Sequence, residues 1–180
     1  MSDAIKRIKA PVHLDYTVTP GVALSRFLAG IVEGRIIGRR CGECHKVYVP
    51  AKGSCPTCGV PMTEDVPVAD TGTLTTFCIV NVPFEGQTMK LPYVYGSILL
   101  DGADLPLLHL VQGIEAADVR MGLRLKAEWV PPAERRPTLE SIRWFVPSGE
   151  PDAAYATYSE AAEGRRDASA NASANKKAGG

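Results

Sequence analysis

The stretch CGECHKVYVPAKGSCPTCG, residues 41–59, holds four of the five cysteines of this 180-residue chain. They form two Cys-x-x-Cys pairs separated by a ten-residue connection: Cys41, Cys44, Cys55 and Cys58. The connection carries alternating Val47, Tyr48 and Val49, followed by the turn-forming Pro50 and Gly53. This pattern predicts a short hairpin that brings the second cysteine pair over the first, as in a zinc ribbon.

Zinc accounts for both cysteine pairs. Four thiolates at this spacing can occupy the corners of a tetrahedron around Zn²⁺, with Zn–S distances of about 2.3 Å. The letters CGECH, which end at His45, also fit a haem c attachment site. Haem leaves the second pair unexplained and normally requires export, so zinc is favoured. Haem, a redox dithiol and iron stay as alternatives. Because four cysteines saturate tetrahedral zinc, the predicted ion is structural and leaves no position for water or substrate.

Composition narrows the class of protein. Hydrophobic content of 45% and charged content of 22% are typical of a globular chain. Twenty basic and twenty acidic side chains cancel, which argues against a nucleic-acid binder. No apolar run approaches the length of about 18 residues that a membrane span needs, and the N-terminus lacks the apolar stretch of a signal peptide. We therefore expect a cytoplasmic protein that binds neither nucleic acid nor a membrane.

We expect a mainly β fold in five parts. An extended arm covers residues 1–18 and an amphipathic helix covers 19–35. A zinc ribbon follows over 36–64 and a five-stranded barrel over 65–147. Residues 148–180 are rich in Ala, Gly and polar side chains and are predicted to form a mostly disordered tail.

The predicted helix has both start and stop signals. Thr19-Pro20 offers a capping hydroxyl and a proline at the first helical position, and Gly34 is a suitable end. Its apolar residues recur at the spacing of one helical face: Leu24, Phe27, Leu28 and Ile31. This stripe could pack against the ribbon or barrel of its own chain, or dock on a partner protein.

The barrel is predicted from period-two segments separated by turns. Five segments alternate apolar and polar residues and are rich in β-branched and aromatic side chains: 71–82, 93–101, 105–112, 123–130 and 139–146. Residues 113–122 form a short helical or turn insertion between the third and fourth strands. This order fits a small Greek-key barrel of the OB type, and a different five-stranded barrel is the main alternative.

The sequence offers no convincing catalytic set. It contains no Gly-rich phosphate loop and no Gly-x-Ser-x-Gly elbow. Cys78 and His109 both lie on predicted barrel strands and could form a dyad, although a buried thiol and a locally paired histidine explain them equally well. Four carboxylates cluster near turns, where such residues commonly occur: Asp101, Asp104, Glu115 and Asp118.

The loop PFEGQTMKLP, residues 83–92, is the second candidate contact region. It joins the first two barrel strands and presents Phe84, Met89 and Lys90. Phe84 could fold back onto the barrel, or the loop could touch an apolar ligand or a partner, because OB barrels often bind through such loops. Lys90, Arg120 and Arg124 are candidates to meet phosphates, but the sequence does not show that they converge.

The assembled order of motifs closely resembles a known family. These are the rubredoxin-like zinc ribbon plus OB-fold proteins associated with acyl-CoA metabolism, catalogued as domain of unknown function 35. The resemblance covers about two-thirds of the chain, from about Phe27 to Val146. It rests on these marks: Glu33-Gly34-Arg35, Arg40, Pro50, Gly72-Thr73-Leu74 and the segment VRMGLRLKAEW. His45 departs from the family pattern, in which a small residue is usual.

The resemblance implies an accessory role. Family members are commonly non-catalytic subunits or fused domains of thiolase-fold enzymes, including lipid-transfer-protein-like thiolases and retro-aldolases. These enzymes act on acyl-CoA in aromatic, steroid or fatty acid degradation. The resemblance therefore implies a thiolase-like catalytic partner, an α2β2 assembly and an acyl-CoA substrate at the shared site. Five residues are candidates to contact the partner or acyl-CoA: Phe27, Leu28, Phe84, Met89 and Lys90. A free-standing acyl-CoA-binding or nucleic-acid-binding OB module is the alternative.

Overall fold

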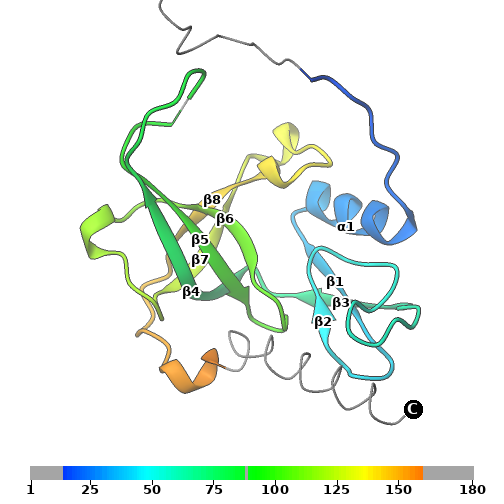
Figure 1. Cartoon of the computed structure of the whole chain (residues 1–180). Helices are drawn as coiled ribbons and strands as arrows, with labels where there is room; N and C mark the ends of the chain where they lie inside the picture. Colours follow the sequence, from blue (N-terminus) through cyan, green and yellow to red (C-terminus); the bar gives the residue numbers. More distant parts are fainter. Residues whose placement is uncertain (1–13, 88, 160–180) are drawn as a thin grey trace, which may run out of the picture.

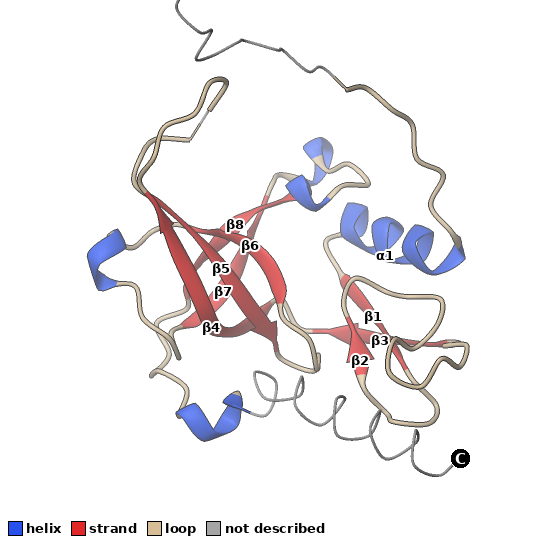
Figure 2. Cartoon of the chain, viewed as in Figure 1, coloured by secondary structure: helices blue, strands red, loops and turns tan. Residues whose placement is uncertain are grey.

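One helix and two β-sheets share an apolar core in the computed structural model, which describes residues 14–87 and 89–159 (Figure 1). Helix α1 spans Val22–Glu33 and is followed by a ribbon sheet and then by a closed barrel. Figure 2 shows the barrel strands together on one side of the molecule and α1 with the ribbon strands on the other. The expected mainly β fold is confirmed.

The ribbon sheet has the order β2-β1-β3 in the described chain. Strand β1 spans Ile36–Arg40 and pairs antiparallel with β2, Val47–Tyr48, and with β3, Glu64–Val68. Strand β3 extends the ribbon sheet to Val68, four residues beyond the range expected from the sequence. It is an edge strand, and this position tolerates Pro67, which has no N–H to donate.

Five strands of the described chain close into a barrel in the order β4-β5-β6-β8-β7. Their bounds are Thr71–Val80 for β4, Tyr93–Leu100 for β5, Leu107–Val111 for β6, Arg124–Trp129 for β7 and Ile142–Pro147 for β8. Leu74, Ile98, Leu125 and Phe145 point inward and are fully buried. A Cβ at Gly96 would lie 2.4 Å from Leu74 Cδ1, so Leu74 would have to shift to admit a side chain into this part of the interior.

Short 3-10 helices occupy the connections of the barrel. Between β6 and β7, η1 spans Ala116–Asp118, within the segment expected to form a turn or helical insertion. Two others, η2 at Pro132–Glu134 and η3 at Leu139–Ser141, precede β8. Because η3 occupies these positions, the fifth strand begins three residues later than the sequence pattern indicated.

Helix α1 starts at Val22, so the predicted start at Thr19-Pro20 is wrong. The carbonyl of Gly21 accepts the first helical hydrogen bond, from Ser25 N at 2.9 Å, and no side chain caps the helix. The predicted end is confirmed, because Gly34 adopts the left-handed conformation at φ 77°.

The ribbon and the barrel are tied together by a reciprocal pair of hydrogen bonds. Asp104 lies in the turn between β5 and β6, and its carboxylate accepts a hydrogen bond from Val47 N at 2.7 Å. Its own N–H donates to the carbonyl of Val47 at 2.9 Å. Asp104 therefore completes the free edge of β2, and the two sheets are fixed to one another at this point.

Residues 148–159 pack against the barrel instead of leaving it. The N–H of Ala153 donates to the carbonyl of Gly122 at 2.8 Å, and Arg120 pairs with Asp152. The short helix η4, Tyr155–Thr157, is followed by Tyr158, which is buried. The rest of the predicted tail, 160–180, and most of the predicted arm, 1–13, lie outside the described residues. Among the described helices, none has the length and apolar character needed to cross a membrane.

Candidate metal centre

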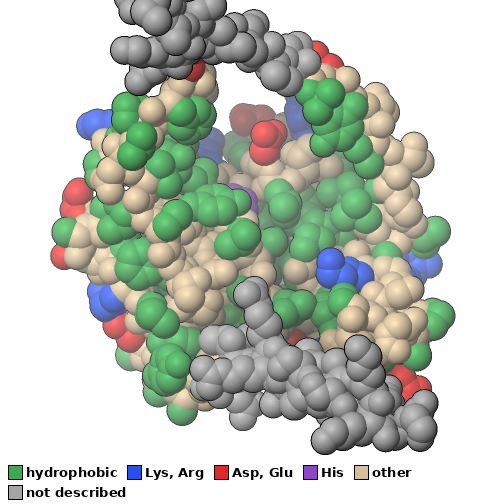
Figure 3. All heavy atoms as spheres, in the orientation of Figure 1, with side chains coloured by type: hydrophobic (Ala, Val, Ile, Leu, Met, Phe, Trp, Pro, Cys, Tyr) green, Lys and Arg blue, Asp and Glu red, His purple; other side chains and the backbone are tan. Residues whose placement is uncertain are grey.

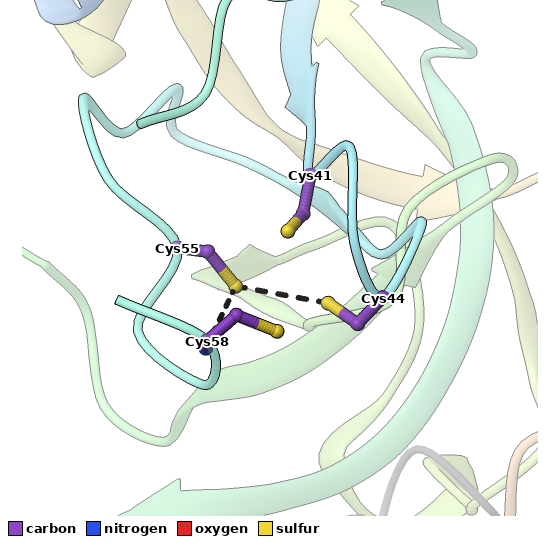
Figure 4. Close-up of side chains that lie close together, drawn as sticks. All are labelled: Cys41, Cys44, Cys55 and Cys58. Atoms are coloured by element: carbon purple, nitrogen blue, oxygen red, sulfur yellow. Dashed lines mark hydrogen bonds between the residues drawn. The ribbon is translucent and has the colours of Figure 1, made fainter. Parts of the chain in front are cut away.

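Four cysteine sulfurs meet at the end of the ribbon (Figure 4). All four Sγ atoms lie within 4.8 Å of one another, and those of Cys44 and Cys55 are 3.7 Å apart. A tetrahedral ion with Zn–S distances of about 2.3 Å requires sulfurs about 3.8 Å apart. Cys41 and Cys55 are buried and Cys58 is exposed, so the site lies just beneath the surface. The donor set and the spacing both fit zinc.

The two knuckles have the same backbone geometry. In the first knuckle the N–H of Cys41 donates to the carbonyl of Lys46, and the carbonyl of Cys41 accepts from the N–H of His45. In the second knuckle Cys55 makes the same two bonds, with Val60 and Gly59. The fourth residue after each first cysteine is left-handed, with φ 59° at His45 and φ 72° at Gly59. Gly42 does not have a positive φ, so the first knuckle does not require glycine at that position.

His45 and Gly59 give a paired prediction about the knuckles. We expect His45→Gly to raise the stability of the zinc-bound chain by up to about 1 kcal/mol, because glycine removes the steric cost of a left-handed residue. We expect Gly59→Ala to lower it by about 1 kcal/mol, because a Cβ at Gly59 meets no atom within 4 Å and only the backbone cost remains. Thermal unfolding of both variants with zinc bound measures the difference. Equal melting temperatures would contradict the argument.

Tyr48 lies next to the sulfurs, although the sequence indicated only that it is a strand residue. Its side chain is 1% exposed, and its hydroxyl lies 3.5 Å from Cys55 Sγ and 3.1 Å from Thr57 Oγ1. Burial and the contact with Cys55 raise the pKa of Tyr48 to about 12, so the phenol stays protonated and can donate to the sulfur. The N–H of Cys58 adds a second donor, 3.4 Å from the same atom.

These donors favour the thiolate of Cys55. Burial works against ionisation, but the hydrogen bonds from Tyr48 and from the backbone of Cys58 and Thr57 outweigh it and lower the pKa of Cys55 to about 6. Because zinc binds thiolates and not thiols, these donors favour metal binding at the Cys55 sulfur. Without the ion the other sulfurs shift the opposite way: the hydrogen bond with Cys44 raises the pKa of Cys58 to about 12, and burial raises the pKa of Cys44.

A buried arginine supports the ribbon beside the metal site. Arg39 on β1 donates through Nε to Asp65 at 2.7 Å and through Nη1 to the carbonyl of Met62 at 2.6 Å. Arg26 of α1 reaches the other oxygen of Asp65 at 2.7 Å. Arg39 and then Arg26 hold the pKa of Asp65 below its usual range. The helix, β1 and β3 are thus joined at one carboxylate.

The five residues expected to contact a partner or acyl-CoA do not come together. Phe27 is 1% exposed and lies in the shared apolar core, and the half-buried Leu28 packs against the same core. In the hairpin between β4 and β5, Phe84 and Lys90 are exposed and Met89 is half-buried. Figure 1 places this hairpin and α1 at different parts of the molecule. The contacts themselves stay a prediction.

The candidate Cys78–His109 dyad is not assembled. Cys78 pairs with Tyr95 on the outer face of the barrel, whereas His109 pairs with Gly96 and is buried on the inner face. The ring of His109 packs edge-on against Phe145, and its Nδ1 accepts a hydrogen bond from Leu110 N at 2.9 Å. His109 is therefore held by local contacts, as a structural histidine would be.

Burial of His109 predicts a pH dependence of stability. Burial, opposed by the hydrogen bonds to Leu139 and Leu110, lowers the pKa of His109 in the folded chain. The unfolded chain then takes up a proton first, so stability is fully present above pH 6.5 and falls as the pH drops below it, by up to about 1.4 kcal/mol per pH unit. Denaturant unfolding at pH 7.5 and 5.5 tests this. The loss should shrink in His109→Gln, and an unchanged loss would contradict the assignment.

The cationic candidates for phosphate binding are engaged within the chain. Arg120 pairs with Asp152, and Arg124 pairs with Asp101 at 2.6 Å and with Glu150 at 2.9 Å. Lys90 lies in the hairpin and not beside them. The arginines therefore fasten residues 148–159 and the β5–β6 turn to the barrel.

Comparison with known proteins agrees with this geometry. The family model of the ChsH2 rubredoxin-like zinc ribbon domain matches residues 28–63, and that of the ChsH2 C-terminal OB-fold domain matches residues 65–130. Together they match more than half of the chain. The sheet, the four cysteines and the barrel thus define a zinc-ribbon and OB-fold protein, and the cysteines are the structural zinc site of its ribbon. Within that class, the chain belongs to the ChsH2 family.

Two solved structures have the same fold. A chain of the structure described as "Ltp2-ChsH2(DUF35) aldolase" is 19% identical with a TM-score of 0.56, and the match covers 73% of this chain and 99% of that one. A DUF35 family protein of unknown function from Sulfolobus solfataricus is 25% identical with a TM-score of 0.50, covering 59% of this chain and 78% of that one. No curated protein matches.

Proposed function

We propose that this chain is a non-catalytic subunit that binds and supports a thiolase-fold enzyme, either a thiolase or a retro-aldolase, acting on acyl-CoA. The catalytic residues then belong to the partner, and an α2β2 assembly is the default because thiolase-fold enzymes are typically dimeric. The family to which the chain belongs supports this proposal, and so does the structure named as an aldolase that contains a ChsH2 chain.

The observation that carries the proposal is the closed metal site. Four sulfurs around one centre fill the coordination sphere of tetrahedral zinc, so the ion has no position for water or a carbonyl oxygen. The metal can therefore fold the ribbon but cannot perform Lewis-acid chemistry. The metal site therefore supplies no catalytic group of its own, which supports a subunit that assists a partner enzyme.

The titratable groups around one open depression of the described barrel support the same proposal. An open depression of about 490 Å³ is lined by Thr73, Asp101, Arg124 and Tyr158 among others. Its arginine and aspartate are paired with each other, and Arg124 holds the pKa of Asp101 below its usual range. A general base or nucleophile would need a free, activated group at such a place.

Co-expression tests the proposal. The thiolase-fold partner should be insoluble or inactive alone, and soluble and active when it is produced together with this chain. The two should then elute as one complex in size-exclusion chromatography. If the thiolase-fold protein turns over its acyl-CoA normally by itself, the proposal is wrong.

Calorimetry separates this function from a free-standing carrier. The isolated chain, titrated with octanoyl-CoA, should give no micromolar binding if its role depends on a partner. Micromolar affinity without a partner would favour the carrier. Retention of an oligonucleotide on filters at moderate salt would favour the nucleic-acid-binding module, for which the balanced charge offers no support.

A further inference from the structure

Tyr48 connects the two knuckles of the metal site. It lies on β2, the strand that follows the first knuckle, but its hydroxyl contacts the second knuckle, at 3.5 Å from Cys55 Sγ and 3.1 Å from Thr57 Oγ1. Strand β2 is itself held in place, because Tyr48 pairs with Arg39 of β1 and the neighbouring Val47 is bonded to the β5–β6 turn. The hydroxyl of Tyr48 therefore joins the second knuckle to a strand whose position is already fixed.

Packing alone does not account for a tyrosine at this position. The side chain is 1% exposed and belongs to the small apolar cluster of the ribbon, with Cys41, Cys55 and Met62. A phenylalanine would fill the same space without burying a hydroxyl, and a buried hydroxyl that has no partner costs about 1–3 kcal/mol. Within the described part of the chain, the partners of the Tyr48 hydroxyl are Cys55 and Thr57. Any role of the hydroxyl therefore depends on these two contacts.

The chemistry of a zinc ligand fixes the direction of both hydrogen bonds. A cysteine sulfur that binds zinc is a thiolate, which has no proton and can only accept. The Tyr48 hydroxyl therefore donates its single proton to Cys55, and its oxygen accepts the proton of the Thr57 hydroxyl. Two hydroxyls in series polarise one another, which strengthens the bond to the sulfur. We call Thr57 and Tyr48 the hydroxyl relay.

The hydroxyl relay makes the four sulfurs unequal. Cys55 is buried, and its sulfur has a second donor in the N–H of Cys58, at 3.4 Å. Figure 4 shows the dashed contacts meeting at the sulfur of Cys55. Cys58 is exposed, and among the residues that the structure describes no N–H or O–H group donates to its sulfur. Hydrogen bonds to a thiolate lower its basicity and with it its nucleophilicity, so Cys55 is the protected sulfur and Cys58 the accessible one.

We infer that Tyr48, oriented by Thr57, is a positioning residue of the zinc site that holds Cys55 as the anchor of the metal, so that the site opens at Cys58. The exposed sulfur of Cys58 is then the first to react with electrophiles, and Cys55 keeps its place until the site has come apart. This inference concerns the chain by itself and does not depend on the proposed function.

Removal of the Tyr48 hydroxyl tests the anchor. Tyr48→Phe keeps the ring and removes only the donor, so the chain should fold while its zinc affinity falls by about tenfold or more, as on loss of a hydrogen-bond partner of a metal ligand. Thr57→Val leaves the donor in place and should lose less affinity than Tyr48→Phe. Tyr95→Phe is the matched control, because Tyr95 lies on β5 and is 40% exposed, and its affinity should stay within about twofold of the wild type. Competition with a chromophoric chelator measures the affinity of each full-length variant.

The cobalt-substituted chain separates positioning from packing. Co²⁺ bound by four sulfurs absorbs through charge transfer from sulfur, and a hydrogen bond to a thiolate lowers the energy of the electrons that are transferred. Loss of the donor in Tyr48→Phe should therefore move this band to longer wavelength, while Tyr95→Phe leaves it in place. If Tyr48→Phe binds zinc as tightly as the wild type, the inference is wrong. A lower affinity with an unmoved band would assign Tyr48 to packing and overturn the inference as well.

Alkylation tests where the site opens. Cys78 is a free, exposed thiol outside the site, so the experiment uses the zinc-bound Cys78→Ser chain, in which the cysteines of the site are the only ones left. Figure 3 shows basic side chains on the surface over the ribbon, so the reagent is the neutral N-ethylmaleimide, which these charges do not attract. The sulfur adds to the double bond of the reagent, and the adjacent carbon takes a proton from water. With less than one equivalent of reagent, peptide mass spectrometry should find the first adduct on Cys58.

The hydroxyl relay also predicts how this distribution changes. When Tyr48→Phe is added to the same Cys78→Ser chain, Cys55 loses a donor, so its share of the first adduct should rise by about threefold or more. A first adduct on Cys55 without that substitution would overturn the inference. A distribution that Tyr48→Phe leaves unchanged would also overturn it, because the hydroxyl would then not protect the sulfur.

Discussion

Removal of zinc is expected to unfold the ribbon of this protein. The ribbon sheet has short strands, and β2 contains only two residues. Its own apolar cluster contains few buried residues, among them Tyr48 and Met62. The binding free energy of structural zinc in small ribbons and fingers is about 10–16 kcal/mol, much more than such a cluster supplies. Without the metal, residues 41–63 should lose their fixed conformation.

The loss should reach the barrel through Asp104 and through the core that the ribbon shares with the barrel, to which Val47 and Val49 belong. The carboxylate of Asp104 is bonded to Val47 N, and Val47 belongs to β2, which follows directly on the first knuckle. When β2 loses its conformation, the β5–β6 turn loses both hydrogen bonds to Val47. The barrel keeps its own interior of Leu74, Ile98 and Phe145. We therefore expect a destabilised but folded barrel beside an unfolded ribbon.

Hydrogen exchange and fluorescence separate the two parts. After chelation, or in Cys55→Ser, amides of the ribbon should exchange on the timescale of an unfolded chain. Trp129 and Trp144 lie on β7 and β8, so tryptophan fluorescence reports on the barrel and should retain a cooperative transition at a lower temperature. Cys78→Ser is the matched control, because Cys78 lies on the outside of the barrel and not among the four sulfurs. One equivalent of bound zinc and an unchanged melting temperature in Cys55→Ser would contradict this prediction.

Local patterns predicted the barrel and the metal site. Strands β5 and β6 alternate buried and more exposed residues, and this alternation is visible in the sequence because one face is buried. In β4 the alternation breaks where the pairing shifts between Leu74 and Thr76. The metal site follows from two Cys-x-x-Cys pairs, since a knuckle turn fixes the distance between the sulfurs within each pair. Both signals are short range, and a single segment contains all the information needed.

Features that depend on distant partners could not be predicted in this way. Asp104 is 57 residues from Val47, and as a turn aspartate it has nothing in its surroundings to indicate a partner in the ribbon. Strand β3 contains Pro67, which obscures a strand signal until its place at a sheet edge is known. The residues that share the outer face of β4, β5 and β6, such as Cys78, Tyr95 and Leu110, were visible as neighbours only after strand pairing had placed the three strands side by side.

The second large effect is expected at Phe27. Its side chain is 1% exposed and lies in a core cluster that includes Ile36 and Val66 of the ribbon and Phe145 of the barrel. Phe27→Ala removes most of this buried ring and leaves a cavity between α1 and the sheets. Substitutions of this kind cost about 3–5 kcal/mol. Denaturant unfolding of the zinc-bound chain should show a loss in this range.

The same variant distinguishes packing from partner contact for the helix. Val22→Ala is the matched control, because Val22 lies on the same helix and is 70% exposed, so its truncation should change stability by less than about 0.5 kcal/mol. If Phe27 instead served mainly to contact the catalytic subunit, Phe27→Ala would leave the isolated chain as stable as the wild type and weaken only the complex. A full loss of stability in the isolated chain would mean that α1 uses Phe27 to hold the ribbon against the barrel. Any contact of the helix with a partner would then have to come from its exposed side chains.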